Sequence, residues 1–102
     1  MSRESLVINM IEDLHKVVTD LNTPGAFTRA YFQTGHELST RANKLVLTMN
    51  ENTDENTAVN IMQADIWICK AKELCYKNDR VGAVNAFNEA ILYLNDMCVP
   101  AV

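Results

Sequence analysis

Apolar side chains recur every three or four residues through most of this chain, which is the spacing of one face of an α-helix. The clearest run lies near the N-terminus and comprises Val7, Ile11, Leu14, Val18 and Leu21. The strict apolar–polar alternation of a half-buried strand is absent, and so are the Asn-Gly and Asp-Gly pairs of tight hairpins. The periodicity therefore predicts an all-α protein.

Breaks in this periodicity divide the chain into four predicted helices. Pro24 with Gly25 interrupts the first run, a polar stretch at 50–56 the second, and Asn78 with Asp79 the third. The predicted helices cover about residues 3–22, 24–49, 54–77 and 80–97. Because short connections place successive helices antiparallel, we expect residues 1–102 to form a single helical domain, a four-helix antiparallel bundle.

The second predicted helix combines an opening signal with a stripe of small residues. Thr23 is positioned to cap it and Pro24 to open it, since proline at the first helical position loses no hydrogen bond. Gly35, Ser39 and Ala42 recur on one side, where they would let another helix approach closely.

The third predicted helix, at 54–77, is apolar around most of its circumference. Such a helix lies either at the centre of a bundle or at an interface. Its apolar residues are Val59, Ile61, Met62, Ala64, Ile66, Trp67, Ile68, Cys69, Ala71, Leu74 and Cys75.

Composition excludes several classes of protein. Of the 102 residues, 48% are hydrophobic and the formal net charge is −4, which argues against disorder and against a nucleic-acid-binding surface. No apolar run is long enough to span a bilayer, and the N-terminus lacks a signal-peptide pattern. An odd count of three cysteines favours reduced thiols. We therefore expect a cytoplasmic protein without a membrane or nucleic-acid partner.

Motifs for catalysis or metal binding are missing. Cys69 and Cys75 point in different directions on a helix, and His15 and His36 belong to no metal-binding spacing. Asp65 is the one carboxylate within an apolar stretch, and we expect it to face water. The expectation is a protein that is not an enzyme and has no cofactor, no metal and no catalytic residues.

Residues 64–94 resemble a tetratricopeptide-type helical hairpin. The matching positions of its two helices and their turn are Trp67, Ala71, Leu74, Asn78, Asp79, Arg80, Ala83, Phe87 and Ala90. Lys70 stands where that motif has a large apolar residue, and the first half of the chain does not repeat the pattern. The same spacing is expected of any tight helical hairpin that needs small residues where its helices cross.

The whole chain is loosely similar in layout to the flagellin-type export chaperones, which are small acidic helical bundles. The correspondences are Leu6-Val7, Arg41-Ala42 and Lys77-Asn78-Asp79, whereas the N-terminal tyrosine segment of that family is missing. Both resemblances imply a non-catalytic role in which an apolar helical surface holds a helix or peptide of a partner.

Two functional hypotheses follow. The first is a protein-interaction module (adaptor, chaperone or inhibitor) that binds another protein through Phe32, Trp67, Tyr76 and Tyr93. For these aromatics, and for Trp67 above all, the competing interpretation is core packing. A homo-oligomer, with a dimer favoured, would form through the heptad seam of residues 7–21.

The alternative hypothesis is a small-ligand protein that sequesters a nucleotide at an oligomer interface. Its binding residues would be Arg41, Lys44, Lys70, Lys72 and Arg80. An ordinary solvated helix end explains the same basic residues.

Overall fold

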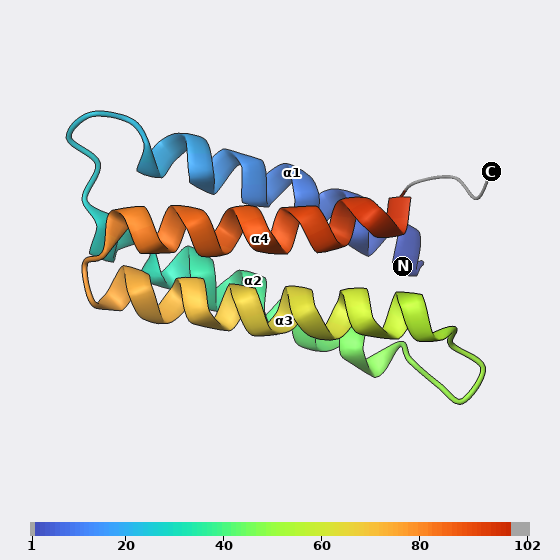
Figure 1. The fold of residues 1–102 in the computed structure, drawn as a ribbon. Coiled ribbons are helices and arrows are strands. Elements are labelled where there is room, and N and C mark those ends of the chain that lie inside the picture. The colour runs from blue at the N-terminus through green and yellow to red at the C-terminus, as the bar shows by residue number, and fades with distance from the viewer. Residues whose placement is uncertain (1, 99–102) are drawn as a thin grey trace.

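The structure, a computed structural model, describes residues 2–98, and within them lie four α-helices and one short 3-10 helix (Figure 1). The elements are α1 (Arg3–Leu21), η1 (Thr28–Tyr31), α2 (Phe32–Leu47), α3 (Glu55–Tyr76) and α4 (Arg80–Cys98). Each α-helix runs antiparallel to the next, and the bundle measures 45 × 25 × 22 Å. The predicted all-α four-helix antiparallel bundle is confirmed.

The helices form a ring in which α3 packs between α2 and α4, and α1 packs between α4 and α2. The α3–α4 and α2–α3 contacts are the most extensive, and the α1–α2 contact is the smallest. Figure 1 shows α1 beside α4 and α2 beside α3. The helix at the N-terminus is therefore held mainly by the helix at the other end of the chain.

The predicted start of the second helix, at residue 24, is wrong. Gly25 has a φ of +86°, which is left-handed backbone that ends a helical path, and Phe27 is extended. The hydroxyl of Thr23 donates to the carbonyl of Thr19 (3.0 Å), so this side chain finishes α1 and does not cap α2. The chain then makes the 3-10 turn η1, and α2 begins at Phe32.

The N-terminal heptad seam lies inside the bundle. Val7, Leu14 and Leu21 are buried in the core, and Ile11 and Val18 pack against it. The core also includes Leu38, Leu45, Ile61, Ile68, Phe87 and Leu94. Because this seam is already covered by the other helices, it is not a surface through which a second copy could bind.

Small side chains bring α3 close to both of its neighbours. A Cβ added to Gly35 of α2 would lie 3.2 Å from both Cα and Cβ of Lys72 in α3. The fully buried alanines of α3 and α4 are Ala64, Ala71, Ala83 and Ala90. The predicted close approach at the small-residue stripe of α2 is therefore confirmed at Gly35.

Side-chain oxygens cap three helix N-termini. Ser2 accepts a hydrogen bond from the backbone N–H of Ser5 (3.2 Å), Asp54 from that of Thr57 (3.1 Å), and Asp79 from that of Gly82 (2.9 Å). Hydrogen bonds from Thr57 hold the pKa of Asp54 below its ordinary value. These caps set where α1, α3 and α4 begin.

Two arginines bind the carboxyl ends of helices distant in sequence. Arg3 Nη2 donates to the carbonyl of Thr48 (2.9 Å) and its Nε to the Thr48 hydroxyl (2.9 Å), at the end of α2. Arg29 Nε donates to the carbonyl of Tyr76 (3.1 Å), at the end of α3. A positive charge is favourable there, because the last carbonyls of a helix lack intrahelical partners.

The tight contact at Gly35 makes a first prediction. Gly35→Leu forces a side chain against the backbone of α3 and should lower the free energy of unfolding by roughly 1–3 kcal/mol, measured by urea denaturation. Gln33→Leu, at an exposed position two residues away, is the control and should change stability by less than about 0.5 kcal/mol. Equal stability of the two variants would contradict the close approach.

Asn60 makes a second prediction, because its amide nitrogen is buried without a hydrogen-bond partner. Asn60→Leu removes that desolvated group and should raise the free energy of unfolding by about 1–2 kcal/mol. Thermal and urea melts measure the change, with the exposed Asn88→Leu as control. A loss of stability in Asn60→Leu would show that the amide is satisfied in the core.

Candidate functional site

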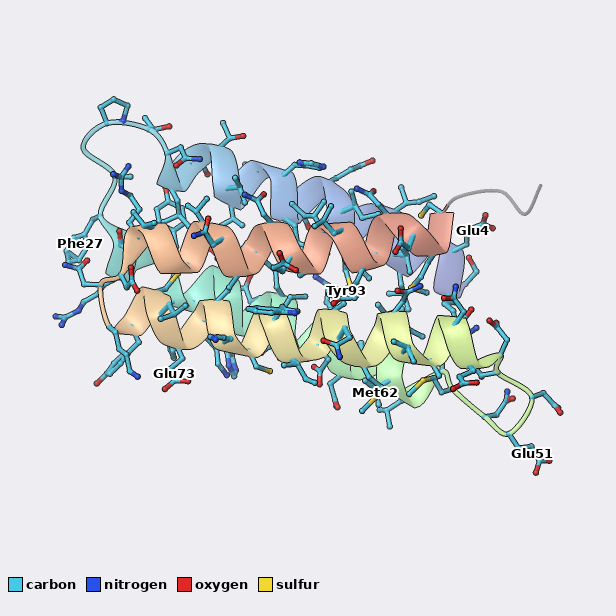
Figure 2. The ribbon with its side chains drawn as sticks, viewed as in Figure 1. Glu4, Phe27, Glu51, Met62, Glu73 and Tyr93 are labelled. Atoms are coloured by element: carbon cyan, nitrogen blue, oxygen red, sulfur yellow. The ribbon has the colours of Figure 1, made fainter. Side chains whose placement is uncertain are left out.

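The outward face of α3 carries a second heptad seam that no helix of the bundle covers. Six exposed residues follow alternating spacings of three and four, and we call them the α3 stripe: Val59, Met62, Ile66, Cys69, Glu73 and Tyr76. Four of them are large hydrophobics, with exposures of 48% (Val59), 44% (Met62), 53% (Ile66) and 65% (Tyr76). In Figure 2, Met62 and Glu73 project from α3 on the side away from α4.

Exposed apolar residues on the other helices form no comparable seam. Val81 and Leu92 lie on the outward side of α4, but Asn85 and Asn88 occupy the positions between them. Ile8 is the one exposed large hydrophobic of α1. Among the described helices, α3 therefore has the longest exposed apolar run at heptad spacing, from Val59 to Cys69, with Glu73 the one charged residue before Tyr76.

Phe32 extends the α3 stripe onto α2. Its ring centroid lies 5.6 Å from that of Tyr76, with an interplanar angle of 59°. Phe32, Cys69, Lys72, Glu73 and Tyr76 line a shallow open pocket between the two helices. Two of the four predicted partner-binding aromatics are thus brought together at one end of the stripe.

The other two predicted aromatics lie elsewhere and pack against the core. Trp67 is half-buried, with the Lys70 ammonium 5.1 Å from its ring centroid, and it lines a groove between α3 and α4. Tyr93 of α4 is half-buried against the core and lies toward α3 (Figure 2). Neither ring belongs to the α3 stripe.

The five basic residues of the alternative hypothesis have separate surroundings. Arg41 pairs with Asp13 of α1 (2.6 Å), Lys70 stacks on Trp67, and Lys72 packs against Gly35 of α2. Lys44 is exposed on α2, and Arg80 is exposed at the start of α4. Lys70 lines a groove between α3 and α4, whereas Lys72 lines a different, shallow pocket beside Phe32 and Tyr76.

The titratable groups of α3 are perturbed mainly by burial. Asp65 is half-buried and not fully open to water, and burial raises the pKa of its carboxyl. Burial, with a smaller effect of the Asp65 charge, raises the pKa of the Cys69 thiol, whose Sγ lies 4.0 Å from Asp65 Oδ1. Cys75 is fully buried, and burial raises the pKa of its thiol to about 11.

The described part of the chain contains no cluster of metal-binding side chains and no membrane-spanning helix. No group of three or more His, Cys, Asp or Glu residues within 2–98 could hold a metal ion. His15 and His36 are both exposed. Among the helices of 2–98, none combines the length and apolar character needed to cross a membrane.

Comparisons with known proteins add no family. No protein family, no curated protein and no solved structure matches this chain. The structure contains an α3–α4 hairpin closed at Asn78, which has a φ of +61°, but the tetratricopeptide and export-chaperone resemblances stay predictions. The function is therefore argued from the chain's own surface.

Sequence reasoning missed most of the α3 stripe because it selected aromatic residues. An aromatic criterion selects Tyr76 but not Val59, Met62 or Ile66, which the sequence shows only as part of an apolar helix. The signal that could have found them is helical spacing. Residues 59, 62, 66, 69, 73 and 76 are three or four positions apart, and they form a second seam on the side of the helix opposite the core.

Thiol chemistry gives a third prediction. Since the thiolate is the reactive form, the raised pKa of Cys69 should make its alkylation by iodoacetamide slow at neutral pH and faster as the pH rises. Asp65→Asn removes a negative charge, lowers the pKa of Cys69 and should shift the rate profile to lower pH. Peptide mass spectrometry measures the rates.

Two internal controls accompany this measurement. Cys75 should stay unmodified in the native protein and react only after denaturation, because it is fully buried. Asp20→Asn, on α1, should leave the Cys69 profile unchanged. An unshifted profile in Asp65→Asn would show that the carboxylate does not act on this thiol.

Proposed function

We propose that this protein is a non-catalytic helical interaction module that binds a helix of a partner chain through the α3 stripe. The observation that carries the proposal is the continuous heptad seam of six exposed positions on a helix whose opposite face is already in the core. A helix that presents apolar residues at alternating three- and four-residue spacing pairs with a second helix by knobs-into-holes packing.

The energetics favour this surface over the rest of the bundle. Covering the exposed half of Val59, Met62 or Ile66 contributes roughly 1 kcal/mol for each side chain. The tilted Phe32–Tyr76 pair adds a large, already oriented aromatic surface at the end of the stripe. The Arg29 hydrogen bond to the Tyr76 carbonyl holds this end of α3 in place before any partner binds.

Site-specific photo-crosslinking tests this proposal and gives the fourth prediction. A photoreactive amino acid at position 66 should cross-link a defined protein in the cells that make this chain. The same group at Leu92, which is similarly exposed (58%) but on α4, should not.

The purified partner then allows a quantitative comparison. Ile66→Glu places a charge in the middle of the stripe and should weaken binding by at least about tenfold in titration calorimetry, since a desolvated charge costs more than 1.4 kcal/mol. Leu92→Glu is the matched control and should bind like the unchanged protein. Equal binding by both variants would rule out the α3 stripe as the contact surface.

A further inference from the structure

Two opposite charges flank the α3 stripe on the same side. Asp65 and Lys72 are one heptad apart, and the contact of Lys72 with Gly35 shows that this flank faces α2. Both are half-buried, and neither has an ion-pair partner within the described part of the chain, where the ion pairs are Arg41–Asp13 and Lys77–Glu73. Each charge would gain from an opposite charge that a second molecule brings.

We propose that the partner of the α3 stripe is a second copy of this chain, bound antiparallel so that Asp65 of each copy lies beside the partner's Lys72. This inference rests on the proposed function, because it names the partner of the same surface. It replaces the dimer expected through the heptad seam of residues 7–21, whose apolar side chains lie in the core or pack against it.

The spacing of the stripe fits a two-fold axis. Antiparallel pairing about the midpoint of the stripe places Ile66 opposite the partner's Cys69, and Val59 opposite the partner's Tyr76. With a rise of about 1.5 Å per residue, Asp65 and the partner's Lys72 then differ by only about 3 Å along the axis. Symmetry creates this ion pair twice.

Charge selects this register over its neighbours. Sliding the partner helix by one heptad in one direction brings Asp65 beside the partner's Asp65. Sliding it by one heptad in the other direction brings Lys72 beside the partner's Lys72. Parallel pairing would gain an attraction of Asp65 to the partner's Lys70. It would also place Glu73 opposite the partner's Glu73 within the seam and Lys72 beside the partner's Lys77. Antiparallel pairing at the midpoint avoids all of these repulsions.

The size of the surface predicts a weak dimer. The stripe runs roughly 25 Å along one helix at 1.5 Å per residue, and a helix is about 10 Å across, so the stripe covers on the order of 250 Å². This area is smaller than the roughly 800 Å² per partner typical of stable complexes. We therefore expect a dissociation constant in the high micromolar range.

Charge reversal with rescue tests the dimer and is the fifth prediction. In sedimentation equilibrium the unchanged protein should show reversible dimerisation between micromolar and millimolar concentrations. Asp65→Lys alone and Lys72→Glu alone should each weaken it by about tenfold, since two attractions become two repulsions. The double variant Asp65→Lys/Lys72→Glu restores the pairs and should return to within about threefold of the unchanged protein.

Cysteine cross-linking tests the orientation. In a Cys69→Ala/Cys98→Ala background, Met62→Cys and Glu73→Cys proteins should form no intermolecular disulfide when each is oxidised alone. A mixture of the two should form one, because antiparallel pairing places position 62 opposite position 73 of the partner. Circular dichroism melts check that each variant retains its fold, as expected for substitutions at exposed positions.

The outcomes separate this inference from the proposed function. A monomer at millimolar concentration or no rescue by the double variant would overturn the antiparallel dimer. So would disulfides within each separate protein without a mixed disulfide between positions 62 and 73. A monomer that still binds a different protein in an Ile66-dependent manner would overturn the dimer alone. Loss of dimerisation in Ile66→Glu, together with rescue of the charge pair, supports both.

Discussion

The close packing of α3 between α2 and α4 is the interaction on which this bundle depends. Gly35 leaves room for the backbone of α3 at Lys72, and four alanines of α3 and α4 are fully buried. Dispersion and burial both grow as helices approach, so these small residues stabilise the fold more than their own size suggests. Larger residues, such as Phe87 and Leu38, fill the space between the layers.

The same packing explains why α3 has a surface to offer. Its inner face packs against α2 and α4, with which it makes the most extensive contacts in the bundle. The outer face then presents side chains at fixed spacing, so a partner helix would meet a preorganised seam and little ordering entropy would be lost on binding. The packing of α3 between α2 and α4 therefore fills the inner face of the helix and leaves its outer face open to a partner.

Much of the fold could be predicted from local patterns. The helix period, the break at Asn78 and Asp79, and the small-residue stripe are each encoded within a few neighbouring residues, and the structure agrees with them. The predicted start of the second helix at Pro24 was wrong, because proline is compatible both with a helix start and with a turn. The left-handed backbone of Gly25 selects the turn. The arginine contacts at helix ends could not be predicted, since Arg3 meets Thr48 only after the helices pack.

The residues of the candidate site are harder to predict from the sequence than the helices. An apolar helix gives the same composition whether its residues face a core or a partner, so Trp67 and Ile66 are equivalent in sequence and become distinct only in the structure. Trp67 packs against the core, and Ile66 lies on the surface. Which face is left open depends on where α2 and α4 settle, and that is a property of the assembled bundle.

The position of α1 has a consequence for how the chain is made. Its apolar seam is covered mainly by α4, whereas its contact with α2, the next helix to be synthesised, is the smallest in the bundle. On the ribosome, α1 therefore emerges with an apolar face that stays exposed until α4, the helix that buries most of it, has been translated. Closure of the bundle therefore awaits α4.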